Sequence, residues 1–281
     1  MKPGNPKPML VGLATAIFAF VLWSAFAPNQ PSILLENVTA SPINNAPQDV
    51  VIFAKIQNGI RHEELISISS AVAEKTSLQK NLNTLAIPQN TTVSMAADSV
   101  HARLTNVKGD LSDGRTIPLT FTFREAGEVT ARARLVAPTS TGSAPSLGLY
   151  GIGDICQVGD GEPAPQISLT ATLNGDGLLI SVLSKDFEFT PELVDGPHVP
   201  GTGHGHIYLN GLKLGRLYSP SHLIRSLPKG EHVVEVTLNT NDHRAYVVGK
   251  SAVRARIAIR AECDYGPESV CAPMIEPQPM D

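Results

Sequence analysis

Short apolar runs separated by strong turn signals constrain the fold of this chain more than any other feature. The segments Asn174–Gly177, Asn210–Gly211 and Glu125–Gly127 each join two such runs. Gly-rich connections of this length are typical of β-hairpins. Residues 49–137 contain no sustained 3.6-residue periodicity, and the runs of the second half alternate like strands. The sequence therefore predicts an all-β protein with two β-sandwich-like, cupredoxin-like domains.

A Gly/Pro/Ser-rich stretch at residues 138–165 divides the β-rich sequence in two. With 281 residues, the chain is long enough to form two hydrophobic cores. Charged residues make up only 17% of the chain and the net charge is −4, so we expect no nucleic-acid partner. The expected organisation is a tether at 28–48, a first β domain at 49–137, the linker at 138–165, a His-rich β-sandwich domain at 166–262 and a C-terminal tail at 263–281.

Residues 1–27 have the pattern of a targeting segment. Lys2 and Lys7 precede an uncharged run from Met9 to Ala27, close to the roughly 20 residues that span a bilayer as a helix. Residues 25–27 have the small-x-small form of a cleavage site, but Pro28 would follow the cut. We therefore expect a signal anchor, with a cleaved signal peptide as the alternative. Either predicts a periplasmic location, anchored to the inner membrane if the segment is kept.

The cysteines form an odd set of Cys156, Cys263 and Cys271. Export makes a disulfide possible, and at most one internal pair can form. The pair is either Cys263 with Cys271, which closes a short loop, or Cys156 with Cys263, which ties the linker to the second domain. We expect a structural disulfide and one spare thiol, because the chain contains no CxxC motif.

The first domain shows a series of motifs in a fixed order. QNG is followed by ISISSAVAEKTSLQK, by IP, by a strand with a histidine and by GDLSDGRTIPLTFTFREAGEVT. Over residues 38–137 this order resembles the PCu(A)C family of periplasmic copper chaperones. The resemblance implies copper(I) binding by histidines and methionines. Of the implied ligand positions only His101 is present, because Gln79 and Arg103 stand at the others and Met95 is out of pattern. We therefore expect the family's fold without its usual copper site.

Six of the eight histidines lie between residues 198 and 243, in the second domain. His204 and His206 are two residues apart on a predicted strand, so their side chains leave the same face and can chelate one ion. His222 and His243 lie in connections that can approach the same end, and Asp242 or Asn241 can orient an imidazole. The predicted metal ligands are His204, His206, His222 and His243. We expect His198 to be a loop residue and His232 a half-buried strand residue.

Imidazole ligands without thiolate or thioether favour copper(II), zinc or nickel. The segment around HGHIYLNGLKLGRLY also resembles a module of exported metal-handling proteins, and the first domain favours copper. We therefore expect a copper-binding protein that is not an enzyme, with a metal ion and an acceptor metalloprotein as partners and a membrane attachment through its N-terminus. The alternative is an envelope interaction or scaffold module in which the histidines are incidental.

Overall fold

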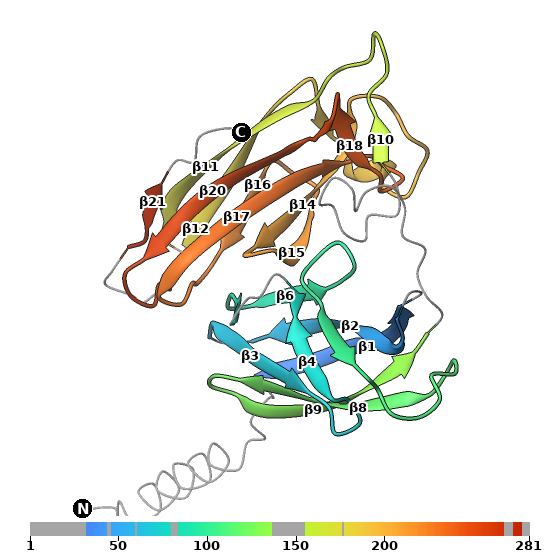
Figure 1. Ribbon diagram of the computed structural model, residues 1–281. Helices are drawn as coiled ribbons and strands as arrows, with labels where there is room; N and C mark the ends of the chain where they lie inside the picture. The colour runs from blue at the N-terminus through green and yellow to red at the C-terminus, as the bar shows by residue number, and fades with distance from the viewer. Residues whose placement is uncertain are drawn as a thin grey trace, which may run out of the picture. The chain divides into compact units, whose positions relative to one another are not determined.

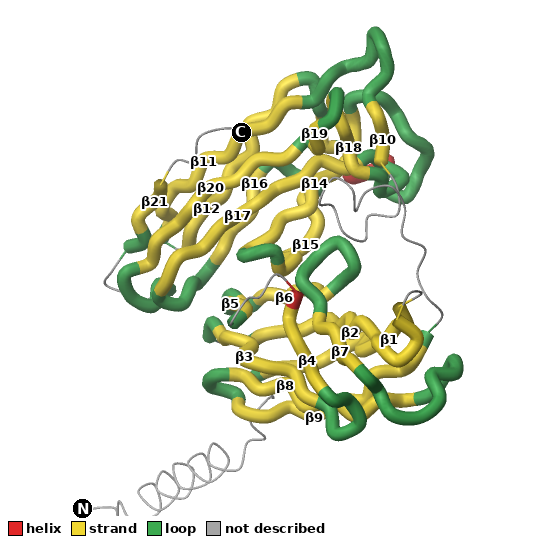
Figure 2. The backbone as a smooth tube through the Cα atoms, in the orientation of Figure 1, coloured by secondary structure: helices red, strands yellow, loops and turns green. Residues whose placement is uncertain are grey.

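Nearly all regular structure in the described part of the chain is β-strand, as the yellow segments of Figure 2 show. This computed structural model describes residues 32–43, 46–59, 61–79, 84–136, 155–175, 177–266 and 272–276. Within these ranges the helical structure is 3₁₀, in the short turn η3 (Pro191–Leu193) and at Gln79. The prediction of an all-β fold is therefore confirmed. The expected signal anchor at 1–27 lies outside the described residues, and no helix within them has the length and apolarity to cross a membrane.

The first half of the described chain forms a continuous path of hydrogen-bonded strands. The order is β5–β3–β8–β9–β1–β2, and the long strand β2 then pairs with both β6 and β7, with β4 beyond β7. Alternate residues of β2 and β8 point inward and form the core, because successive side chains of a strand leave opposite faces. The strands are β1 (Ile33–Ile43), β2 (Ala46–Asn58), β3 (Glu63–Ser69), β4 (Lys75–Leu78), β5 (Leu85–Ile87), β6 (Thr91–Met95), β7 (Ala102–Thr105), β8 (Thr116–Phe123) and β9 (Gly127–Leu135).

Strand β1 lies where the sequence predicts a tether. It pairs antiparallel with β2 and parallel with β9. The register shifts between Glu36 and Thr39, and Asn37 has a positive φ of 49°. A bulge of this kind breaks the two-residue alternation on which strand prediction depends. The expected start of the first domain at residue 49 is therefore too late, and the strand structure begins at Ile33.

The second half forms two layers of strands, visible in Figure 1. One layer is β11–β12–β16, and the other is β21–β20–β17–β14–β15. At one end β18 pairs with β17, β10 and β19, and β13 pairs with β14. The strands are β10 (Ile155–Gln157), β11 (Gln166–Asn174), β12 (Gly177–Lys185), β13 (Glu188–Phe189), β14 (Thr202–Leu209), β15 (Leu212–Leu217), β16 (Ser221–Ile224), β17 (Gly230–Asn239), β18 (Ala245–Val248), β19 (Ser251–Ala252), β20 (Arg254–Ala261) and β21 (Met274–Glu276).

The turn after β6, residues 96–101, lies against the β14–β15 hairpin. The backbone N–H of Val100 donates to the carbonyl of Gly211 at 3.0 Å, and the Ser99 hydroxyl donates to the same carbonyl. Strand β6 also pairs with β15 through Ser94 and Lys213. This contact is the reason that both faces of β14 are buried: Ile207 faces the core between the layers, and His206 on the opposite face is only 4% exposed.

The sheets of the second half also include residues from the segments that the sequence predicts to be linker and tail. Residues 155–157 form β10, which runs parallel to β18, and residues 274–276 form β21 beside β20. Cys263 is disulfide-bonded, whereas Cys156 on β10 is buried and lies outside the disulfide. The alternative pairing of Cys156 with Cys263 is therefore excluded.

Candidate metal centre

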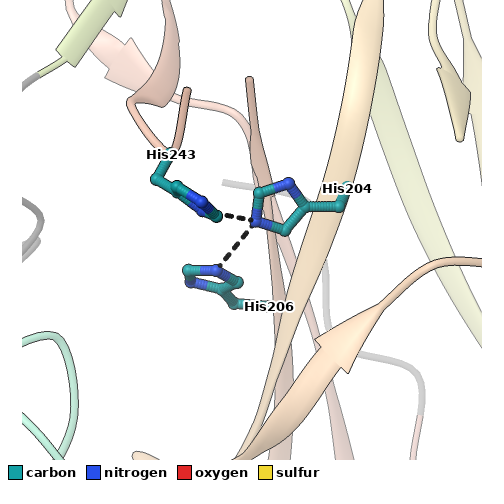
Figure 3. A group of neighbouring side chains, drawn as sticks. All are labelled: His204, His206 and His243. Carbon is teal, nitrogen blue, oxygen red and sulfur yellow. Dashed lines mark hydrogen bonds between the residues drawn. The ribbon is translucent and has the colours of Figure 1, made fainter. Parts of the chain in front are cut away.

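Three imidazole rings converge at the end of β14 (Figure 3). Nε2 of His204 lies 3.2 Å from Nε2 of His206 and 3.3 Å from Nδ1 of His243. One ring nitrogen from each residue lies within 4.8 Å of the other two. A tetrahedral ion with metal–nitrogen bonds of about 2.0–2.1 Å separates its ligand nitrogens by about 3.3 Å. The spacing of the three rings thus fits a first-row transition metal ion.

Two elements bring these rings together. His204 and His206 leave the same face of β14, and the antiparallel pairing of β14 with β17 places His204 opposite Asn239, the last residue of β17. His243 lies in the turn that follows β17 and has a positive φ of 68°. Its backbone N–H donates to the carbonyl of Thr240 at 3.0 Å, which closes the turn. The turn directs the His243 ring back over the first of the two strand histidines.

Asn241, which is fully buried, fixes this turn to β14. Its side-chain amide donates to the Thr202 hydroxyl at 3.0 Å, and its carbonyl oxygen accepts from the Thr190 hydroxyl at 3.2 Å. Its backbone carbonyl accepts the N–H of Asp195 at 2.9 Å. Buried side-chain networks in which every member is bonded hold one geometry. Asn241 therefore positions the turn and the segment after η3, and does not bond to an imidazole.

Asp195 holds the outer nitrogen of His243. Its Oδ1 lies 2.5 Å from Nε2 of His243, and this hydrogen bond lowers the pKa of the Asp195 carboxyl. The adjacent acid, Asp242, instead binds Arg244 and the Thr240 hydroxyl. The sequence-based choice of Asp242 or Asn241 as the orienting residue is therefore wrong, and Asp195 takes that role. A carboxylate on one ring nitrogen leaves the other nitrogen as the lone-pair donor.

The inner side of the cluster faces a buried ion pair. Lys213 on β15 donates to Oδ2 of Asp98 at 2.5 Å, and the same oxygen lies 3.2 Å from Nδ1 of His206. The Tyr208 hydroxyl donates to Asp98 at 3.3 Å. Burial alone would raise the pKa of Asp98, but the hydrogen bond from His206 and the charge of Lys213 outweigh it, so the pKa is well below its usual range. Asp98 is therefore an anion at neutral pH.

Burial keeps the two strand histidines neutral. It lowers the pKa of His204 to about 3, with a further contribution from the neighbouring imidazoles. It lowers the pKa of His206 to about 4, against the opposing hydrogen bond to Asp98. Only a neutral imidazole has the lone pair that a metal ion requires. At neutral pH both rings are therefore in the state that binds metal.

His222, the fourth predicted ligand, is not part of this group. It lies on β16, where it pairs with Ile180 of β12 in the three-stranded layer. The prediction treated residues 219–222 as a loop that folds back over the site, but residues 221–224 continue a sheet. The structure therefore brings together three of the four predicted ligands.

The other two histidines of the second half have separate environments. His198 lies in a loop, as expected, with Nε2 3.6 Å from the Cys156 sulfur and its ring against Tyr246. His232 is 4% exposed, so it is buried rather than half-buried, and it shares the inward face of β17 with Val234. Neither belongs to the cluster.

The implied copper positions of the first half carry structural contacts. Arg103 binds the Asp49 carboxylate through two nitrogens, at 2.6 and 3.0 Å. His101 is 6% exposed, and its Nδ1 lies 3.2 Å from the Ser99 carbonyl. The backbone of Gln79 donates to the His101 carbonyl at 3.0 Å, so the two positions are neighbours. Met95 is 1% exposed in the core. Of these positions, His101 is therefore the one that carries an imidazole.

Sequence reasoning missed Asp98, Asp195 and Lys213. A signal for Lys213 existed, since the Asn210–Gly211 turn sets the register that places Lys213 opposite Tyr208. Tyr208 shares the face of the strand histidines, so Lys213 belongs on that face too. No local pattern identifies Asp98 or Asp195, because each reaches the cluster through the tertiary fold.

Comparison with known proteins identifies the first half. Residues 33–135 match the LpqE-like family model, whose description names a lipoprotein. The first domain is LpqE-like. This match confirms the resemblance that the sequence shows to the related PCu(A)C domains. The match ends at residue 135 and does not include the second half of the chain, which carries the histidine cluster.

Solved structures are similar to parts of the chain. A copper-bound PCuAC domain from PmoF2 is 23% identical, covers 38% of this chain and 94% of its own, and has a TM-score of 0.36. The copper(I)-bound DR1885 protein of Deinococcus radiodurans is 18% identical over 41% of this chain and 85% of its own, with a TM-score of 0.35. The periplasmic chaperone SfaE is 9% identical over 80% of this chain and 97% of its own, with a TM-score of 0.22. No curated protein matches the chain.

Proposed function

We propose that this chain binds a copper ion through His204, His206 and His243 and passes it to another metalloprotein by ligand exchange. The ion is cargo, and the chain is not an enzyme. The rings of His204 and His206 are neutral, and the three ligand nitrogens are nearly in position before an ion arrives. Preorganised ligands bind an ion without a large cost in ordering the side chains.

The observation that carries this proposal is the environment of His204. The ring is 0% exposed, and its Nε2 bonds only to the imidazoles of His206 and His243 within the described residues. Among the described residues, its Nδ1 is buried without a hydrogen-bond partner. A buried polar group that lacks a partner costs about 1–3 kcal/mol. A ring held in this way contributes little to folding, but it is well placed to bind a metal ion.

The choice of metal follows from the ligands and the family. Three imidazoles without sulfur suit copper, zinc or nickel. The LpqE-like first domain and its PCu(A)C resemblance favour copper among these. Three protein ligands leave a coordination position that an acceptor's ligand can take, and exchange of this kind needs no catalytic base. The side chains of His243 and Asp195 are 32% and 74% exposed, so an acceptor can approach from this side.

The location follows from the family description and the N-terminal sequence. The LpqE-like description names a lipoprotein. The uncharged run from Met9 to Ala27 predicts export, with attachment to the membrane where the segment is kept. Both support a copper site outside the cytoplasm, where an acceptor metalloprotein would receive the ion.

The test is a metal titration of the full-length protein with matched histidine variants. Purified without chelators, the wild-type protein should bind about one copper ion per chain. His204→Ala with His206→Ala should abolish this stoichiometric binding, whereas His222→Ala should retain it because His222 lies on the other layer. Equal binding by the double variant and the wild type would overturn the site. It would favour the envelope interaction module instead.

A further inference from the structure

Oδ2 of Asp98 gathers three donors beside the histidine cluster. It accepts from Lys213 Nζ at 2.5 Å and from the Tyr208 hydroxyl at 3.3 Å, and it lies 3.2 Å from Nδ1 of His206. Asp98 comes from the turn after β6, which is part of the LpqE-like domain, whereas the other three residues lie on β14 and β15. The side chains of Asp98, Lys213 and His206 are 11%, 13% and 5% exposed. The group is therefore protected from most competing water.

The neutral ring of His206 can carry its proton on Nδ1 or on Nε2. Lys213 Nζ also lies 3.0 Å from its Nδ1. If Nδ1 donates to Asp98, the proton is on Nδ1 and the lone pair of Nε2 points at His204. If Lys213 donates to Nδ1, the proton of the neutral ring must be on Nε2, because a neutral imidazole has one N–H. Only the first arrangement leaves Nε2 able to bind a metal ion.

We propose that Asp98 is the positioning residue of the metal centre: its carboxylate selects the Nδ1–H form of His206 and neutralises Lys213. The inference rests on the proposed function, and it assigns to the LpqE-like domain a role in a site that the other half of the chain carries. The carboxylate offers Nδ1 of the ring an acceptor, which the ammonium, as a donor only, does not provide. An acceptor on the far nitrogen also makes the ligand nitrogen more basic.

The charges support the same role. Lys213 places a positive charge next to a site for a cation, which repels a dication more than a monocation. Asp98 offsets this charge at 2.5 Å in a largely buried environment. Without the carboxylate, a dication would bind beside an uncompensated ammonium. Without the ammonium, the carboxylate would attract the dication instead.

The first experiment reads the His206 ring directly in the metal-free protein. Long-range proton–nitrogen correlation spectra of the ¹⁵N-labelled full-length chain distinguish Nδ1–H from Nε2–H rings. The wild type should show the Nδ1–H form at His206. Asp98→Ala should show the Nε2–H form, because the Lys213 ammonium, 3.0 Å from Nδ1, can only donate to it, and the Tyr208 hydroxyl at 3.3 Å can donate as well. An Nε2–H ring in the wild type, or an Nδ1–H ring in Asp98→Ala, would overturn the proposal.

The second experiment measures the dissociation constant for zinc, a redox-silent probe, by competition with a chelating dye. Asp98→Ala should raise the Kd by about 10–100-fold, the usual range for loss of a carboxylate behind a histidine ligand. Asp49→Ala is the matched control, because Asp49 also binds a basic side chain and a backbone N–H but makes no bond to the cluster. It should leave the Kd unchanged.

Lys213→Met keeps the proposal testable if Asp98→Ala does not fold. This variant should retain the Nδ1–H ring and bind zinc more tightly than the wild type, because the repelling charge is gone and the acceptor remains. Weaker zinc binding by Lys213→Met would overturn the proposed role of the pair. A wild-type protein that binds no metal would refute the proposed function itself, while the ring spectra of the metal-free protein would still decide the role of Asp98.

Discussion

Nε2 of His204 lies 3.3 Å from Nδ1 of His243, although 39 residues separate them in the sequence. The contact depends on β17, which pairs with β14 along its length and ends at Asn239, opposite His204. The chain then turns at residues 240–243 and brings the second ring to the first. The histidine cluster is therefore a product of strand register, and changes to the register or to the turn should alter it.

Asp195→Asn should weaken zinc binding only a few-fold. Asp195 holds Nε2 of His243, so its loss frees the ring to rotate. Its side chain is 74% exposed, and water can replace an exposed carboxylate much more easily than a buried one. The effect should therefore be smaller than that of Asp98→Ala in the same competition titration. Asp242→Asn is the control, since Asp242 binds Arg244; a larger loss in Asp242→Asn would contradict the assignment.

Gly203→Ala should destabilise the protein and disturb the cluster together. A Cβ atom at Gly203 would lie 2.0 Å from the backbone carbonyl oxygen of Asn239, and the residue has a φ of 154°. The strands would have to separate next to His204, and overpacking of this kind costs about 1–3 kcal/mol. Urea unfolding measures the loss of stability, and a zinc titration should show weaker binding.

Gly175→Ala provides the comparison for Gly203→Ala. A Cβ atom there would meet nothing within 4 Å. Its unfolding free energy should stay within about 0.5 kcal/mol of the wild type, as for most surface substitutions. If both alanine variants were equally stable, the close approach of β14 and β17 at Gly203 would be refuted.

The sequence was sufficient to predict the hairpins and the two strand residues of the histidine cluster, His204 and His206. Asn210 and Gly211 both have positive φ values, of 52° and 81°, as a two-residue hairpin turn requires. The two-residue spacing of His204 and His206 is enough to place both rings on one face. These features are local, because they depend on residues that are neighbours in the sequence or in one hairpin.

The rest depends on contacts that no local pattern encodes. The Ser-Pro-Ser segment before His222 suggests a loop that reaches the site, yet Ser221 and His222 pair with β12. Asp98 lies in another domain of the sequence, and Asp195 follows a short 3₁₀ turn. Strand β1 was missed for a different reason, since its bulge conceals the alternation. Tertiary pairing therefore overrides local signals at each of these positions.

Cys156 should be a single, protected thiol. It is 4% exposed and lies outside the disulfide that Cys263 forms, so one of the three cysteines of the chain keeps its thiol. A thiol reagent should react slowly with the native protein and label one thiol per chain in denaturant without reductant. Cys156→Ser should show no labelling in either state. Three labelled thiols in the denatured wild type would contradict the disulfide.

His232 should make the stability of the metal-free protein depend on pH. Its Nε2 donates to the Pro228 carbonyl at 2.8 Å, and its Nδ1 accepts from the Asn210 amide at 3.1 Å. A proton on Nδ1 would break the second bond, and burial lowers the pKa of His232 in spite of the Pro228 carbonyl. The folded pKa is thus below the unfolded value of about 6.5. The contribution of the neutral His232 ring to the free energy of unfolding is present above pH 6.5. It is lost as the pH falls, because the unfolded chain then binds more protons than the folded one.

The measurement compares the wild type with His232→Gln by urea unfolding between pH 7.5 and 5.5, with a chelator present in both. The unfolding free energy of the wild type should fall more steeply with decreasing pH, by up to about 1.4 kcal/mol per pH unit for one proton. His204, His206 and His222, whose pKa values burial also lowers, remain in both proteins and cancel in the difference. Parallel curves for the two proteins would show that His232 does not remain neutral in the fold. Convergence of the two curves toward low pH would instead support the neutral ring, bonded between Pro228 and Asn210.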